Sequence, residues 1–176
     1  MTDPLFPLVA RVATGGLFLA AAAHKLAQRR RFAGVLEGYK VFGHAAPALA
    51  VLTPVMEALA GAGACAPVAV VREIGLGICI ALLVAYAALV AWALRRGDRE
   101  IDCGCLGFSA KRPRIRPAMV GRNLGLSVFA LIGFAPADPR PFVWLDGVGL
   151  VGAGLTLVLL YVFLEQLIAL PARNPT

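Results

Sequence analysis

Charged residues are scarce in this chain of 176 residues. Only 15% of the residues are Asp, Glu, Lys or Arg, whereas 60% are hydrophobic and the mean hydropathy is +0.80. One soluble core of this length cannot hide so much apolar surface, so the composition excludes a soluble globular protein and predicts an integral membrane protein. The chain also has only two His and four Cys, too few for a multi-metal site or a disulfide scaffold.

Acidic residues are rarer than basic ones, with 10 Asp and Glu against 17 Lys and Arg and a net charge of +7. In a soluble protein this excess would favour nucleic-acid binding. Here most basic residues lie in short segments between apolar runs, which is typical of the signal that orients a membrane protein. We therefore predict that the chain contacts a lipid bilayer and binds no nucleic acid.

Five apolar runs approach or exceed the ~20 residues that a spanning helix needs. The fourth is the shortest and carries Arg122 and Asn123 near its start, which makes it the least secure. No basic segment precedes the first run, so a spanning helix fits it better than a cleaved signal. We predict an all-α polytopic membrane bundle, with residues 1–176 forming a single integral-membrane domain of about five transmembrane helices. The runs are residues 8–27, 47–66, 74–94, 118–135 and 145–169.

Lysine and arginine are distributed unequally between the two sides of the predicted membrane. Twelve lie in connections on one side, against Arg72 and Arg140 on the other. By the positive-inside rule the rich side is cytoplasmic. We therefore expect a cell (inner) membrane protein with its N-terminus outside, and with its C-terminus and the segment of Cys103 and Cys105 inside. The twelve are Arg29, Arg30, Arg31, Lys40, Arg95, Arg96, Arg99, Lys111, Arg112, Arg114, Arg116 and Arg173.

Residues 31–46 carry apolar side chains at helical spacing among basic neighbours. This pattern predicts a short interfacial helix that lies on anionic lipid. A solvated loop with some hydrophobic residues is the alternative. The apolar residues are Phe32, Val35, Leu36, Tyr39 and Phe42.

Two cysteines one residue apart occupy the polar segment between the third and fourth runs. Cys103 and Cys105 can close a disulfide only through a very small ring, and Gly104 is best able to take the strained backbone that this demands. A strained, accessible disulfide is more oxidising than a structural one, so the pair suits thiol–disulfide exchange. Basic neighbours favour the thiolate, while Asp102 opposes it. Two inert cysteines, or a metal site in which the thiolates join His24, are the alternatives.

Glu57 lies near the middle of the second run. A carboxylate at that depth costs at least ~2.5 kcal/mol, so we expect it to be protonated, paired or beside a water-filled cavity. The best partners are Lys25, at the inner end of the first run, and Arg122, which can snorkel along the fourth. We predict that these three residues and Asp102 form a polar site that supports the cysteine pair. A purely structural ion pair is the alternative.

Cys65 and Cys79 lie near the outer ends of the second and third runs, where a disulfide between them is geometrically feasible. We favour the interpretation that both are small hydrophobic packing residues.

The chain resembles the MauE family of bacterial inner-membrane proteins, a relative of the DoxX group, over nearly its whole length. The specific part of the resemblance is the Cys-Gly-Cys segment followed by Arg-Asn. The matching stretches are His24-Lys25-Leu26, residues 32–39, Pro54 with Glu57, residues 102–107 and Arg122-Asn123-Leu124.

The resemblance implies a multi-pass, redox-associated protein of DoxX-like fold that is linked to methylamine utilisation. It implies a role in maturation or disulfide formation of the disulfide-rich small subunit of periplasmic methylamine dehydrogenase. That function acts outside, whereas the charge count places Cys103 and Cys105 inside. Either the segment exchanges electrons with a cytoplasmic thiol donor, or the orientation is reversed, or the pair is regulatory. We follow the charge count because its margin is large.

Three functions fit these residues. The first is a thiol–disulfide oxidoreductase component in which Cys103 and Cys105 cycle, with a quinone as candidate cofactor. Its candidate partners are a thioredoxin-like protein and an exported, disulfide-containing client. The second is a maturation or scaffolding factor without turnover. The third is a small transporter of copper or another thiophilic ion, with Glu57 as a way-station in the membrane.

Overall fold

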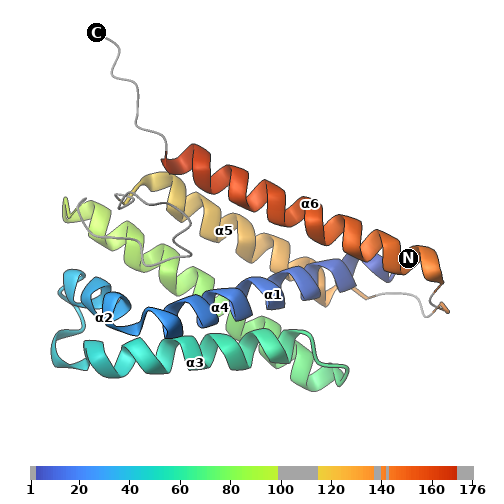
Figure 1. Cartoon of the computed structure of the whole chain (residues 1–176), viewed down its shortest axis with the longest axis horizontal. Coiled ribbons are helices and arrows are strands. Elements are labelled where there is room, and N and C mark those ends of the chain that lie inside the picture. The colour runs from blue at the N-terminus through green and yellow to red at the C-terminus, as the bar shows by residue number, and fades with distance from the viewer. Residues whose placement is uncertain (1–2, 99–114, 137–139, 142, 170–176) are drawn as a thin grey trace, which may run out of the picture.

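The computed structural model describes residues 3–98, 115–136, 140–141 and 143–169, and these residues form a bundle of helices. Figure 1 shows α6 along one flank of the bundle and α2 at one end. The elements are α1 (Leu5–Ala27), α2 (Arg29–Gly38), η1 (Gly43–Ala45), α3 (Ala46–Ala64), α4 (Ala69–Arg95), α5 (Pro117–Leu131), η2 (Ile132–Phe134) and α6 (Trp144–Ala169).

Five of these helices are long and apolar enough to cross a membrane, so the protein is a multi-pass membrane protein and the five predicted spans are confirmed. Their ends differ from the apolar runs by up to five residues. The largest difference is at α4, which begins at Ala69 and not at residue 74, so its first turns include Arg72 and Glu73. Hydropathy does not detect such polar first turns, because the backbone can become helical several residues before the apolar run begins.

The three-helix contact of α1, α3 and α4 depends on glycines that let the backbones approach closely. A Cβ atom on Gly15 would lie 2.7 Å from the carbonyl oxygen of Gly61, and one on Gly61 would lie 2.8 Å from that of Gly15. A Cβ on Gly75 of α4 would lie 2.5 Å from the carbonyl carbon of Gly63. Small residues favour helix association in lipid in this way.

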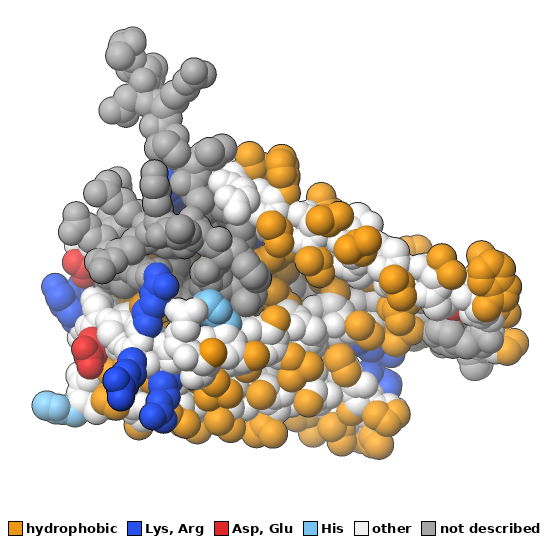
Figure 2. Space-filling model, in the orientation of Figure 1, with side chains coloured by type: hydrophobic (Ala, Val, Ile, Leu, Met, Phe, Trp, Pro, Cys, Tyr) orange, Lys and Arg blue, Asp and Glu red, His pale blue; other side chains and the backbone are white. Residues whose placement is uncertain are grey.

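The predicted interfacial helix forms, but its apolar face does not lie on lipid. The helix is α2, and its Phe32, Val35 and Leu36 are buried. They belong to one hydrophobic cluster with Ala46 and Ala50 of α3, Val90 and Ala93 of α4, and Ile115 and Met119 near the start of α5. The apolar stripe therefore packs on protein, because the ends of α3 and α4 offer an apolar surface of their own beside it. The basic residues at the start of α2 are exposed, and Figure 2 shows a group of basic side chains at this end of the bundle.

A glycine ends α4 just before the cysteine segment. Gly97 adopts a left-handed backbone with φ of +81°, and its N–H donates to the Leu94 carbonyl at 3.1 Å. The N–H of Asp98 donates to the Ala93 carbonyl at 3.2 Å. This pair of hydrogen bonds is a Schellman motif, which satisfies the last carbonyls of the helix. The sequence Leu-Arg-Arg-Gly-Asp therefore stops the span where residues 99–114 begin.

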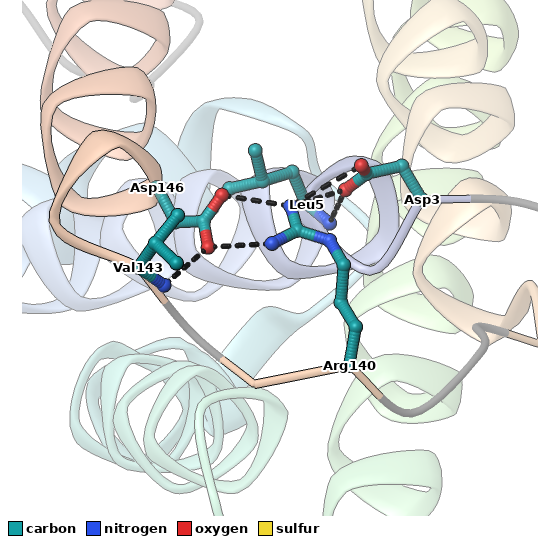
Figure 3. Close-up of polar contacts among 5 residues, drawn as sticks. All are labelled: Asp3, Leu5, Arg140, Val143 and Asp146. Atoms are coloured by element: carbon teal, nitrogen blue, oxygen red, sulfur yellow. Dashed lines mark hydrogen bonds and ion pairs between the residues drawn. The ribbon is translucent and has the colours of Figure 1, made fainter.

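A guanidinium joins the start of α6 to the start of α1 (Figure 3). Arg140 donates to both carboxylate oxygens of Asp146 at 2.7 Å and to those of Asp3 at 3.1 and 3.2 Å. The backbone N–H of Leu5, together with this guanidinium, lowers the pKa of Asp3. The Val143 N–H donates to Asp146 at 2.8 Å, so the same carboxylate also caps α6.

Candidate functional site

The only buried lysine among the described residues pairs with the carboxylate that the sequence singled out. Lys25 comes from the last turn of α1 and Glu57 from α3, and their side chains are 6% and 1% exposed. The Lys25 ammonium donates to Glu57 Oε1 in a salt bridge. The expected partnership of Lys25 with Glu57 is therefore present in the structure.

Tyr86 of α4 completes the cluster. Its hydroxyl donates to the same Glu57 oxygen at 2.5 Å, and Lys25 Nζ donates to the Tyr86 hydroxyl oxygen at 3.4 Å. Lys25 Nζ also lies 4.7 Å from the centre of the Tyr86 ring and 5.2 Å from that of Phe32. One carboxylate and two aromatic rings thus replace the water that this ammonium loses on burial.

A cavity of about 50 Å³ lies beside this cluster. Its polar lining comes from Lys25, Glu57 and Tyr86 and from three residues of α5 and α6, namely Arg122, Asn123 and Tyr161. The Arg122 guanidinium lies 5.8 Å from the centre of the Tyr161 ring. Arg122 was expected as a direct partner of Glu57, and the structure places it on the wall of the same cavity.

Glu57 and Asn123, which line this cavity, each have a buried polar atom with no hydrogen-bond partner among the described residues. These atoms are Glu57 Oε2 and Asn123 Nδ2, an acceptor and a donor. Buried groups of this kind are normally satisfied, so each needs a reason. The volume exceeds the roughly 10–15 Å³ that one water requires. The cavity therefore has both the room and the unmet polar groups to hold water or one end of a small molecule.

Cys103, Cys105 and Asp102 lie outside the described residues, so their positions stay predictions. The described chain on either side is placed, with Asp98 at the end of α4 and Ile115 before α5. Ile115 is 2% exposed and belongs to the same buried cluster as Phe32. Because the Phe32 ring also contacts Lys25, the cluster that contains Ile115 borders the Lys25–Glu57 pair.

The other two cysteines are free thiols, so the disulfide between Cys65 and Cys79 is not formed in the structure. Cys79 is fully buried with Phe18, Leu76 and Leu83 in the second hydrophobic cluster, which agrees with a packing role.

Sequence reasoning missed Tyr86 and Tyr161 and gave Asn123 no role in the site. Tyr86 carries the only hydroxyl in the apolar run 74–94, and a lone hydroxyl in such a run was the available signal. Which helices meet at that depth follows from tertiary packing, and no spacing within the sequence encodes it.

Comparison with known proteins gives one family and several full-length relatives. A family described as "Methylamine utilisation protein MauE" matches residues 3–136. The methylamine utilization protein MauE of Paracoccus versutus is 35% identical, over 100% of this chain and 94% of that protein. MauE of Paracoccus denitrificans is 32% identical over 99% of this chain and 93% of that protein. MauE of Methylorubrum extorquens is 28% identical over 92% of this chain and 87% of that protein. No solved structure gives a significant match.

Proposed function

The chain belongs to the MauE family of methylamine utilisation proteins, and from this premise we propose a thiol–disulfide role in the maturation of an exported partner. Membership confirms the resemblance predicted from the sequence. The coarse function is methylamine utilisation by a multi-pass membrane protein. The finer proposal is that Cys103 and Cys105 exchange disulfides on behalf of a disulfide-containing exported protein.

The proposed step is an exchange between two dithiols. A thiolate of a thioredoxin-like partner attacks the Cys103–Cys105 disulfide, and a mixed disulfide forms as one cysteine leaves as thiolate. The second partner thiolate then attacks the mixed disulfide. The partner ends as a disulfide and the Cys103/Cys105 pair ends as a dithiol, with two electrons transferred and two protons taken up by the pair.

The buried cluster of Lys25, Glu57 and Tyr86 is the observation that carries this proposal. Lys25, in the last turn of α1, contacts Phe32, whose hydrophobic cluster includes Ile115 just after the cysteine segment. The buried cluster also holds two charged groups, those of Lys25 and Glu57, in a protein interior where such groups are costly. Thiol exchange releases and consumes protons, and Glu57 Oε2, which has no hydrogen-bond partner among the described residues, is a candidate acceptor in that exchange.

The transporter interpretation is weaker on the same geometry. A way-station for a copper ion needs a carboxylate that attracts cations. Glu57 is instead neutralised by the Lys25 ammonium, which repels a second cation at that position.

Side-specific thiol labelling tests the proposal. In a Cys65→Ala/Cys79→Ala background, a membrane-impermeant maleimide should label the remaining thiols in inverted vesicles and not in spheroplasts. This follows from the inside location that the positive-inside count predicts. Labelling in spheroplasts alone would reverse the orientation and place the exchange outside.

Trapping distinguishes exchange from scaffolding. A Cys105→Ala variant should accumulate a mixed disulfide through Cys103 with a thioredoxin-like protein, and dithiothreitol should release it. Growth on methylamine should be lost in Cys103→Ser/Cys105→Ser. The thiol role is wrong if Cys103→Ser/Cys105→Ser supports growth and Cys105→Ala forms no mixed disulfide. The protein would then be a maturation factor without turnover.

A further inference from the structure

A second and larger cavity lies between α1 and α6 at membrane depth. Its volume is about 390 Å³, within the range of roughly 300–1,000 Å³ that is usual for small-molecule sites. Its walls are apolar, and Thr14 and Tyr161 supply the only side-chain hydroxyl groups among its lining residues. The most apolar stretch of α6 has no buried residue, so α6 covers the cavity loosely and the bilayer lies beside it.

This apolar cavity adjoins the small polar cavity of Glu57. Leu17, Leu83, Leu126 and Tyr161 line both. A ligand that occupies both cavities would therefore have a long apolar part beside α1 and α6 and a short polar end near Glu57. Glu57 and Asn123 line the smaller cavity, and their Oε2 and Nδ2 atoms are buried without a partner among the described residues.

We propose that these two cavities are a binding site for a lipid-soluble quinone. A quinone carbonyl would accept a hydrogen bond from Asn123 Nδ2, and a quinol hydroxyl would donate one to Glu57 Oε2. The apolar tail would lie between α1 and α6. An acyl chain of a phospholipid fits the apolar part equally well but leaves both polar atoms unsatisfied, and burying such atoms without partners is costly.

The inference rests on the proposed function for its chemistry, because a quinone would accept the electrons of the cysteine pair. Oxidation of the Cys103/Cys105 dithiol to a disulfide releases two electrons and two protons, and these reduce one quinone to one quinol. Binding itself requires neither sulfur, so the two proposals can fail separately.

Equilibrium binding of decylubiquinone to the purified full-length protein in detergent is the test. We expect saturable binding at one site. Gly154 lines the cavity, and a Cβ atom there meets nothing within 4 Å. Gly154→Leu should therefore fill the cavity and weaken binding by about tenfold or more. Gly152→Leu is the matched control, because Gly152 lies on the same helix, is exposed and does not line the cavity. It should bind like the parent.

Asn123→Leu tests the polar end, since it removes a donor that has no partner among the described residues and keeps the number and branching of the side-chain heavy atoms. It should also weaken binding, while Cys103→Ser/Cys105→Ser should bind like the parent. An azidoquinone should label peptides of α1 and α6, a readout that needs no variant. Absence of saturable binding, equal binding by Gly154→Leu, or displacement by an equal concentration of a saturated fatty acid would overturn the quinone site. Intact binding with no thiol activity would overturn the proposed function alone.

Discussion

Removal of the Lys25 ammonium should destabilise the protein by about 3–5 kcal/mol, the usual cost of breaking a buried ion pair by deleting one partner. Lys25→Met keeps most of the side-chain volume but leaves Glu57, which is 1% exposed, with the Tyr86 hydroxyl as its one remaining donor in the described part of the chain. At about 1.4 kcal/mol per tenfold change, the ratio of folded to unfolded protein should fall roughly a hundredfold to several thousandfold.

The double variant Lys25→Met/Glu57→Leu should recover most of that stability. Both charges are then gone, and replacement of a whole buried pair by apolar residues of similar volume is often neutral or stabilising. Arg30→Met is the matched control, because Arg30 is exposed on α2 and its loss should change the free energy of unfolding by less than about 0.5 kcal/mol.

Unfolding by sodium dodecyl sulfate in mixed micelles, followed by far-UV circular dichroism, measures these differences. The reasoning is refuted if Lys25→Met unfolds at the same detergent fraction as the parent. It is refuted equally if the double variant is no more stable than Lys25→Met. A double variant that is stable yet inactive in thiol exchange would show that the pair serves the chemistry beyond its part in folding.

Further predictions concern the close helix contacts and the Arg140 hydrogen bonds that join the start of α6 to the start of α1. Gly75→Ala should cost about 1–3 kcal/mol because its Cβ would lie 2.5 Å from a backbone carbon of α3, whereas Gly77→Ala, which meets nothing within 4 Å, should be neutral or stabilising in the same unfolding assay. Arg140→Ala should speed hydrogen exchange in the first turn of α6, since that guanidinium joins Asp146 to Asp3. Acid should also speed this exchange, because the pKa of Asp3 is lowered in the folded protein. The contribution of Asp3 to stability is therefore complete above its unfolded pKa of about 3.9. It is lost as pH falls through the lower folded pKa. Asp3→Asn should remove that part of the pH dependence of exchange, and an unchanged pH profile would refute the assignment.

The spans of this protein were predictable because hydropathy acts locally. A run of some twenty apolar residues has few alternatives to a membrane helix, so the five spans follow from composition alone. Their polar first turns do not, as Arg72 and Glu73 in α4 illustrate. The prediction that the apolar face of α2 lies on lipid was also wrong. An apolar stripe such as Phe32, Val35 and Leu36 looks the same in the sequence whether lipid or protein covers it.

The polar site was predictable in part for the same reason. A carboxylate in the middle of a span demands a partner, so Glu57 could be singled out from its depth, with Lys25 and Arg122 as candidate partners. The structure pairs it with Lys25. Tyr86 and Tyr161 could not be predicted as members of the site. A neutral hydroxyl is less costly to bury than a charge, so its presence on an apolar helix does not indicate which neighbour it contacts. The role of the cysteine segment also stays a prediction, since residues 102–107 lie outside the described residues.

The redox state of Cys103 and Cys105 in intact cells tests the central claim most directly. In a Cys65→Ala/Cys79→Ala background, acid quenching followed by alkylation with a polyethylene-glycol maleimide counts the free thiols as a shift on a gel. We predict a mixture of oxidised and reduced pairs, and a population shifted toward one form in Glu57→Gln. Two thiols that are fully reduced in every cell, and indifferent to Glu57→Gln, would contradict the account.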